Sequence, residues 1–291
     1  MNTTSRPVLV GVDGHVHSRL ALEHAVAEAV HRGRELRIVH AVPVTVGGVY
    51  VLPVLEHQEE VAEQVLREAV DRVRELAPDL PVTTTHPVGD AAACLVHESQ
   101  HADLVVVGAR GRGAAASAFL GSTSLYVAGH AYCPVAVVRH LPPPDTTTRG
   151  IVVGADGSAT GDAALGEAFR LADERDLHLS VVHASTLASV ETQLTIIDSP
   201  DLRERVLDEE RLVMDRAVGA WQEKYPDVEV DTRIVDDHPV QALLEAAEGA
   251  VLLVVGSRGR GGFAGLVLGS VGQGVLHGAS CPVLVVRPER R

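Results

Sequence analysis

Residues Leu104–Arg139 read LVVVGARGRGAAASAFLGSTSLYVAGHAYCPVAVVR, and a similar stretch at Leu252–Arg287 reads LLVVGSRGRGGFAGLVLGSVGQGVLHGASCPVLVVR. Each copy contains an apolar run, a loop rich in Gly and Arg, a segment that begins with Gly-Ser, and a second apolar run. We interpret this order as strand, loop, helix and strand. Glycines at fixed positions between a strand and a helix are a common way for the backbone to surround a phosphate.

The duplication extends over the whole chain. Paired positions are offset by 143 residues in the first part of each copy and by 148 later, as in Asp13/Asp156 and His40/His183, then Gly108/Gly256 and Cys133/Cys281. The second copy therefore has five extra residues (148 − 143), which we expect in a loop or long helix near 186–211. The Pro- and Thr-rich segment HLPPPDTTTRG is typical of a linker. We predict one domain at 1–140, a linker at 141–149 and a second domain at 150–291.

Apolar runs alternate with segments of helical periodicity. In the first copy we predict strands at 7–13, 36–42, 82–86, 103–108 and 134–139, and helices at 18–32, 55–76 and 90–101. Ser18 is the expected N-cap of the first helix, and Gly33 is the expected C′ residue that directly follows it. In the second copy we expect a strand at 150–156, a helix at 161–174 and a strand at 177–183.

This alternation predicts two tandem open five-stranded parallel α/β domains of Rossmann-like type. With the strand order 3-2-1-4-5, strands one and four lie side by side where the winding reverses, and ligands bind at their carboxyl ends. Asp13 and Gly108 would face one such crevice, and Asp156 and Gly256 the other.

Composition excludes several classes of function. The net charge of −14 argues against a general nucleic-acid-binding surface. No apolar run reaches the length of a membrane span, so we expect a cytoplasmic protein. Lys224 is the one lysine among 25 basic residues, so a Walker-type phosphate loop is absent. The three cysteines form no disulfide framework or metal spacing, and we interpret Cys133 and Cys281 as small buried hydrophobes.

Two histidine patterns have a structural interpretation. His97–His101 matches the zinc-protease pattern H-E-x-x-H, but it has no third ligand, and the second copy lacks it, so we expect no metal site. His40 and His183 occupy matching positions near strand ends, where we favour a hydrogen-bonded structural role over a general base. The loop arginines are open to two interpretations, phosphate steering or solvated charge: Arg110, Arg112, Arg258 and Arg260.

The two glycine patterns resemble the nucleotide-binding branch of the universal stress protein family, in its tandem two-domain form. That branch has Gly, two residues, Gly, nine residues, then Gly and Ser or Thr. Gly108, Gly111, Gly121 and Ser122 fit this spacing, and Gly256, Gly259, Gly269 and Ser270 fit it again.

The resemblance implies a role for each position. Asp13 and Asp156 would lie at the ribose, with Gly108 and Gly256 near it, and the backbone of Ala41 and Ala184 would hold adenine. The remaining glycines and hydroxyls would surround the phosphates, and Mg²⁺ would bind through those phosphates. The full expected set is Asp13, Ala41, Gly108, Gly111, Arg112, Gly121, Ser122, Thr123, Asp156, Ala184, Gly256, Gly259, Arg260, Gly269 and Ser270.

One departure from the family pattern distinguishes the copies. Asp156-Gly157-Ser158 keeps the usual triplet, whereas the first copy has Asp13-Gly14-His15. A histidine is bulkier and can become charged at mildly acid pH. We therefore expect two sites of unequal affinity, with the second closer to the family pattern.

The resulting expectation is an ATP-binding stress-response or signalling protein with one nucleotide site per repeat. We expect no catalytic residues and, at most, weak ATPase activity. The alternatives are a slow ATP hydrolase and an interaction scaffold with vestigial sites. The family resemblance also implies that the halves pair through their terminal strands as a pseudo-dimer. A homodimer and an unidentified protein partner are compatible with the sequence; binding to nucleic acid or membrane is not expected.

Overall fold

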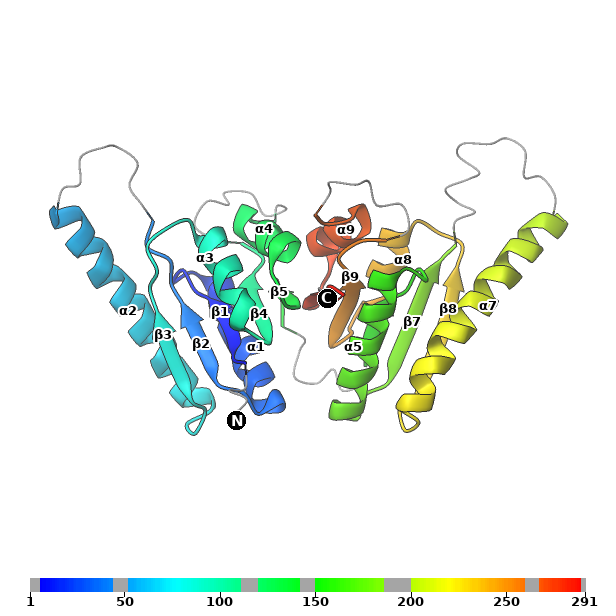
Figure 1. Ribbon diagram of the computed structural model, residues 1–291, viewed down its shortest axis with the longest axis horizontal. Coiled ribbons are helices and arrows are strands. Elements are labelled where there is room, and N and C mark those ends of the chain that lie inside the picture. Colours follow the sequence, from blue (N-terminus) through cyan, green and yellow to red (C-terminus); the bar gives the residue numbers. More distant parts are fainter. Residues whose placement is uncertain are drawn as a thin grey trace. The chain divides into compact units, whose positions relative to one another are not determined.

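The computed structural model describes residues 6–43, 52–110, 120–141, 150–185, 200–259 and 267–288. Side chains are described from residue 58 in the second helix and from residue 204 in its counterpart in the second half. The chain divides into two compact units, Met1–Leu141 and Pro142–Arg291 (Figure 1).

The first unit has a parallel sheet in the order β3-β2-β1-β4-β5. Its strands are β1 (Val8–Gly11), β2 (Leu36–Val39), β3 (Val82–Thr85), β4 (Leu104–Gly108) and β5 (Val135–Val138). The apolar runs form strands because β1, β4 and β5 are buried on both faces, as parallel strands usually are. The predicted fold class and strand order are confirmed.

Helices cover both faces of this sheet (Figure 1). They are α1 (Val16–Arg32), α2 (Leu52–Leu76), α3 (Ala91–Glu98), the 3₁₀ turn η1 (Ser99–His101) and α4 (Ser122–His130). The helices α1 and α2 contact each other, as do α3 and α4. Right-handed crossovers place the first pair on one face and the second pair on the other.

The second unit repeats this arrangement with the order β8-β7-β6-β9-β10. Its strands are β6 (Ile151–Gly154), β7 (Leu179–Ala184), β8 (Val230–Val235), β9 (Leu252–Gly256) and β10 (Val283–Val286). Its helices are α5 (Ala159–Arg175), α7 (Pro200–Lys224), α8 (Pro239–Ala246) and α9 (Ser270–Gly278).

The five extra residues of the second copy precede its long helix. The strands β2 and β7 begin 143 residues apart (179 − 36), whereas α2 and α7, each of 25 residues, begin 148 apart (200 − 52). The offset therefore changes between β7 and Pro200, and the insertion lies outside the helix.

Two corrections concern helix starts. Ser18 is not the N-cap of α1, because the helix begins two residues earlier with His15 at its N-cap, which makes no side-chain capping bond. Ser18 is buried, and its Oγ donates to the His15 carbonyl at 2.9 Å. The second-copy helix also starts earlier than Gly161, because Ser158 caps it by accepting a hydrogen bond from the Gly161 amide.

Other helix ends follow the sequence more closely. Gly33 ends α1 with a left-handed φ of 58°, as predicted. The predicted helix at 90–101 is divided into α3 and η1, and Asp90 is the N-cap, with its side chain accepting from the Ala93 amide.

The core consists mainly of Val, Leu, Ile and Ala, and it includes both repeated cysteines. Cys133 is 7% exposed and Cys281 is 2% exposed. Burial raises the pKa of the Cys133 thiol to about 12 and that of Cys281 to about 11. Both thiols therefore remain protonated near neutral pH, as small buried hydrophobes.

An aromatic cluster joins α5 to α7 in the second unit. Trp221 packs on Gly166, and its Nε1 donates to Asp162 Oδ1 at 3.0 Å. The Lys224 ammonium lies 5.1 Å from the ring centroids of both Trp221 and Tyr225. Both contacts are within the range of a cation–π interaction. Among the described residues, no helix is both long and apolar enough to cross a membrane.

Candidate functional site

A cavity of about 300 Å³ opens in the first unit at the carboxyl ends of β1, β2 and β4. This is the switch point of the sheet, where the winding reverses between β1 and β4. Four of the expected site residues line it: Asp13, Ala41, Gly108 and Thr123. The other residues that matter for its chemistry are His40, Pro43, Gly89, Asp90, Arg110 and Ser124.

The loop after β1 holds a carboxylate at one side of the cavity. Gly14 has a φ of 81°, and the His15 amide donates to Asp13 Oδ1 at 3.0 Å. The Asp13 amide in turn donates to Ser18 Oγ at 3.3 Å. The first bond holds the Asp13 side chain through one of its two oxygens, and the second holds its backbone.

Gly108 forms the floor of the cavity at the end of β4. A Cβ at this position would lie 2.6 Å from the His17 carbonyl oxygen and 3.1 Å from the Ser18 amide nitrogen. The start of α1 therefore packs directly on the β4 backbone, and any larger residue would push the two apart.

The start of α4 supplies backbone donors at the cavity, which Thr123 and Ser124 line. Gly121 is its N-cap, and the Gly121 amide donates to the Ala109 carbonyl at 2.8 Å. Ser124 Oγ donates to the Gly108 carbonyl at 2.6 Å, which ties the first turn of α4 to the floor. The first amides of a helix have no partners within the helix and favour a negative charge.

His40 and His183 have the structural role that the sequence suggested. His40 is 4% exposed, and its Nδ1 lies 2.8 Å from the Val12 carbonyl. His183 is 2% exposed, and its Nδ1 lies 2.7 Å from the Ala155 carbonyl. A carbonyl oxygen only accepts, so Nδ1 carries the proton in each ring. Each histidine thus ties one strand end to the aspartate-bearing loop of its unit.

The second unit builds a corresponding site around Asp156. Asp156 Oδ1 accepts from the Ser158 amide at 2.9 Å and from Ser158 Oγ at 2.6 Å. A Cβ at Gly259 would lie 2.8 Å from Asp156 Oδ2, so the glycine loop passes close to this carboxylate. A Cβ at Gly256 would lie 2.8 Å from the Thr160 carbonyl oxygen, as at Gly108 in the first unit.

The remaining expected residues of this site lie around α9. Gly269 is the N-cap of α9, and its amide donates to the Ser257 carbonyl at 2.9 Å. Ser270 is the first residue of α9, and Ala184 ends β7. In the first unit, Ser122 is likewise the first residue of α4. Three predicted site residues, Gly111, Arg112 and Arg260, lie outside the described residues.

Sequence reasoning missed the contribution of the loop after β3. The Gly89 amide donates to the Val42 carbonyl at 2.8 Å, which brings Gly89 and Asp90 to the cavity beside Ala41. The available signal was the Gly89 residue itself, which directly precedes an aspartate N-cap. Its counterpart in the second copy is Asp237, so the repeat comparison did not select it.

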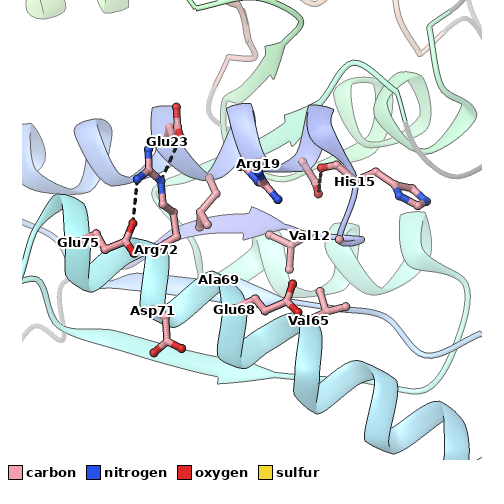
Figure 2. A pocket seen from close by; sticks show the side chains of 13 residues that line it. Val12, His15, Arg19, Glu23, Val65, Glu68, Ala69, Asp71, Arg72 and Glu75 are labelled. Atoms are coloured by element: carbon pink, nitrogen blue, oxygen red, sulfur yellow. Dashed lines mark hydrogen bonds and ion pairs between the residues drawn. The ribbon is translucent and has the colours of Figure 1, made fainter.

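A larger cavity of about 610 Å³ lies between α1 and α2, with different chemistry (Figure 2). Its lining includes four carboxylates, Glu23, Glu68, Asp71 and Glu75, and two arginines, Arg19 and Arg72. Arg72 is bound to Glu23 at 2.7 Å and to Glu75 at 2.9 Å. A surplus of carboxylates repels a phosphate, so this cavity does not suit an anionic ligand.

His15 lines this second cavity and not the one at Asp13 (Figure 2). The predicted contribution of its side chain to the Asp13 site therefore lacks support from the cavity lining. The difference between His15 and Ser158 affects the start of the helix. Ser158 caps α5 through its hydroxyl, whereas His15, at the N-cap of α1, makes no side-chain capping bond.

The described residues show no cluster of three or more His, Cys, Asp or Glu side chains that could hold a metal ion. His97 lies in the last turn of α3, and His101 ends the following 3₁₀ turn.

Comparisons with known proteins, by family model, by sequence and by structure, all point to one family. The family model described as "Universal stress protein family" matches residues 4–139 and 147–287. The chain is similar to universal stress protein Rv2005c of Mycobacterium tuberculosis, with 35% identity over 96% of each chain. A universal stress protein of Mycolicibacterium smegmatis is also 35% identical and covers 99% of each chain. The crystal structure of a universal stress protein from Archaeoglobus fulgidus shares the fold, with a TM-score of 0.72, 24% identity and coverage of 98% and 97%.

Proposed function

The chain belongs to the universal stress protein family, and we propose that each of its two repeats binds one adenine nucleotide. The observation that carries the proposal is the cavity at Asp13, Gly108 and the start of α4. It combines a carboxylate, a glycine floor and helix amides at the switch point of the sheet. Its volume of about 300 Å³ is at the lower end of ordinary ligand pockets.

Each group has a part of the nucleotide that it suits. Asp13 and Asp156 accept hydrogen bonds from the ribose hydroxyls, since an ionised carboxylate is a strong acceptor for two neighbouring donors. The backbone of Ala41 and Ala184 holds the adenine edge. The glycine loops and the first amides of α4 and α9 bind the phosphates, and Mg²⁺ neutralises the remaining phosphate charge.

Only a few groups near the cavity attract the phosphates, because the protein as a whole is acidic. With a net charge of −14, the protein as a whole repels a triphosphate. Backbone amides and the loop arginine Arg110, which lines the cavity, provide positive potential at short range. This favours phosphate contact over solvated charge for Arg110.

We place the protein in stress response or signalling, where bound nucleotide shifts its stability or its choice of partner by mass action. Cytoplasmic location is part of this proposal. Slow ATP hydrolysis is the second candidate, and a scaffold with vestigial sites is the third.

The test is to denature freshly purified protein and quantify the released nucleotide by ion-exchange chromatography and mass spectrometry. We expect close to two ATP per chain. ADP alone would favour the hydrolase, and an empty protein that also ignores added ATP would favour the scaffold. Turnover above roughly one per second, an ordinary enzyme rate, would also contradict simple binding.

Titration calorimetry with Mg-ATP then assigns the sites. Asp13→Asn and Asp156→Asn each remove one charge but keep an oxygen that accepts the loop amide. We expect each to weaken one of the two sites about tenfold or more, because a hydrogen bond to a charged group is worth about 1.5–3 kcal/mol. Asp79→Asn, at an exposed turn after α2, is the matched control and leaves both sites unchanged.

A further inference from the structure

Beside its cavity the first unit has a group of two arginines and two histidines, of which the second unit keeps only the arginines. Among the described residues, the charged and titratable groups that interact electrostatically with His17 are Arg110 after β4, Arg139 and His140 after β5, and Asp13 before α1. His17 itself lies beside the cavity, between Val16 and the cavity residue Ser18, and does not line it. Arg110 also lines the cavity, together with Thr123 and Ser124 at the start of α4. Arg110 is therefore the residue through which this group reaches the proposed phosphate position.

His17 is held in place by the packing of the α1 start. Its carbonyl lies against Gly108, because a Cβ added to Gly108 would be 2.6 Å from the His17 carbonyl oxygen. Its Nδ1 is buried, and among the described residues it has no hydrogen-bond partner. The imidazole therefore has a ring nitrogen that no described group engages, and its protonation responds to the charge around it.

Burial and the local charges favour the neutral form of His17 in the free protein. Burial lowers the pKa of the His17 imidazole below its usual value of 6.5, and Arg110, Arg139 and His140 lower it further, while Asp13 opposes them. Burial and Arg110 also lower the pKa of Arg139. Positive charge is crowded here, which is an environment that an incoming anion relieves.

The corresponding place in the second unit does not titrate. His17 corresponds to Thr160, whose hydroxyl donates to the Arg258 carbonyl and lies 3.0 Å from Ser158 Oγ. His140 corresponds to Pro288, whereas the arginines are kept as Arg258 and Arg287. The difference between the two sites is therefore a pair of histidines beside otherwise matching arginines.

We propose that His17, with Arg110, Arg139 and His140, responds to phosphate charge in the first site alone. The His17 imidazole takes up a proton when a nucleotide binds there. This inference rests on the proposed nucleotide binding. The phosphate approaches the cationic group, relieves its mutual repulsion and favours the imidazolium. The second site, with Thr160, binds the same ligand without that proton.

The direction of the pH dependence follows from linkage. The bound state holds its His17 proton more tightly than the free state, so affinity rises as the pH falls through the bound-state pKa. The gain levels off below the free-state pKa, which lies under 6.5. Each pKa unit raised by the ligand corresponds to a tenfold gain in affinity. Discrimination also follows, because a triphosphate presents more charge to this group than a cyclic monophosphate does.

The test uses Mg-ATP calorimetry on the full chain between pH 5.5 and 8, in two buffers of different ionisation enthalpy. The Asp156→Asn background reports the first site and the Asp13→Asn background reports the second. We expect net proton uptake and an affinity gain of about tenfold toward low pH at the first site only. Protonation of ATP itself affects both sites alike, so the second site is the internal reference.

Reciprocal variants locate the effect. His17→Thr, which copies the second unit, abolishes the proton uptake at the first site, and Thr160→His introduces it at the second. If a variant at His17 or Thr160 is unstable, calorimetry of the first site in the Asp156→Asn background still tests the proposal. Net proton uptake is expected there without any change at His17. Tight ATP binding with equal pH profiles at both sites overturns this inference and leaves the proposed function intact. Absence of ATP binding at every pH overturns the proposed function itself.

Discussion

Gly33 and Asp176 occupy the same position in the two repeats, directly after α1 and α5, and both are left-handed. Their φ values are 58° and 51°, and Asp176 is the one described non-glycine residue with a positive φ. A Cβ in this region is strained, and glycine is the preferred residue after a helix. The same turn is therefore formed with less strain in the first repeat.

We expect Asp176→Gly to raise the free energy of unfolding by about 0.5–1 kcal/mol, because it removes that strain. The reciprocal variant Gly33→Asp should lower it by a similar amount, since a Cβ at Gly33 meets nothing within 4 Å and only the backbone is affected. Urea unfolding measures both. Changes of the same sign in the two variants would contradict the argument.

At single positions, the sequence predicted the residues that two repeats share. Asp13, Ala41 and Gly108, which the second repeat has as Asp156, Ala184 and Gly256, line the cavity. His17 and Gly89 were missed because each is replaced in the second repeat, by Thr160 and Asp237. A comparison of repeats selects what is common and passes over what makes one site different. Only the packing of α1 on Gly108 revealed the surroundings of His17.

At the scale of elements, the contact between α5 and α7 depends on one glycine. A Cβ at Gly166 would lie 2.5 Å from Cη2 and Cζ2 of Trp221. We expect Gly166→Ala to lower the free energy of unfolding by about 1–3 kcal/mol, because the indole must move away from the helix. Gly219→Ala in α7 is the matched control.

The control has the opposite expected sign. A Cβ at Gly219 meets nothing within 4 Å, and alanine is a better helix former by about 1 kcal/mol, so Gly219→Ala should stabilise the protein. Both variants can be measured by urea unfolding. If Gly166→Ala were as stabilising as Gly219→Ala, the indole would not be packed as described.

The strands and the topology were predictable because apolar runs, glycine punctuation and crossover handedness all favour one arrangement. Helix starts were less predictable. The sequence offered Ser18 as an N-cap, but the hydroxyl turns back to the His15 carbonyl and the helix begins earlier. Several residues near a helix start can cap it, and the sequence alone does not choose between them.

For the whole molecule, the pairing of the two halves through their terminal strands remains a prediction. Trp221, the one tryptophan, reports on the second unit alone. We expect Leu104→Ala, in the buried β4 of the first unit, to lower the urea midpoint read from Trp221 fluorescence, because paired halves unfold together. Val30→Ala, at an exposed position of α1, is the control and leaves it unchanged.

An unchanged Trp221 midpoint in Leu104→Ala, together with an earlier transition in circular dichroism, would show that the halves unfold independently. Relaxation measurements that find the two halves tumbling separately would also contradict the pairing.

The aromatic contact of Lys224 has a practical consequence. Because the chain has a single lysine, acylation or ubiquitin-type conjugation of a side-chain amine can occur only at Lys224. The Lys224 ammonium lies 5.1 Å from the ring centroid of the one tryptophan. A fluorescent acyl group attached to Lys224 would be an energy-transfer acceptor for Trp221. The transfer efficiency would then report whether the end of α7 is folded.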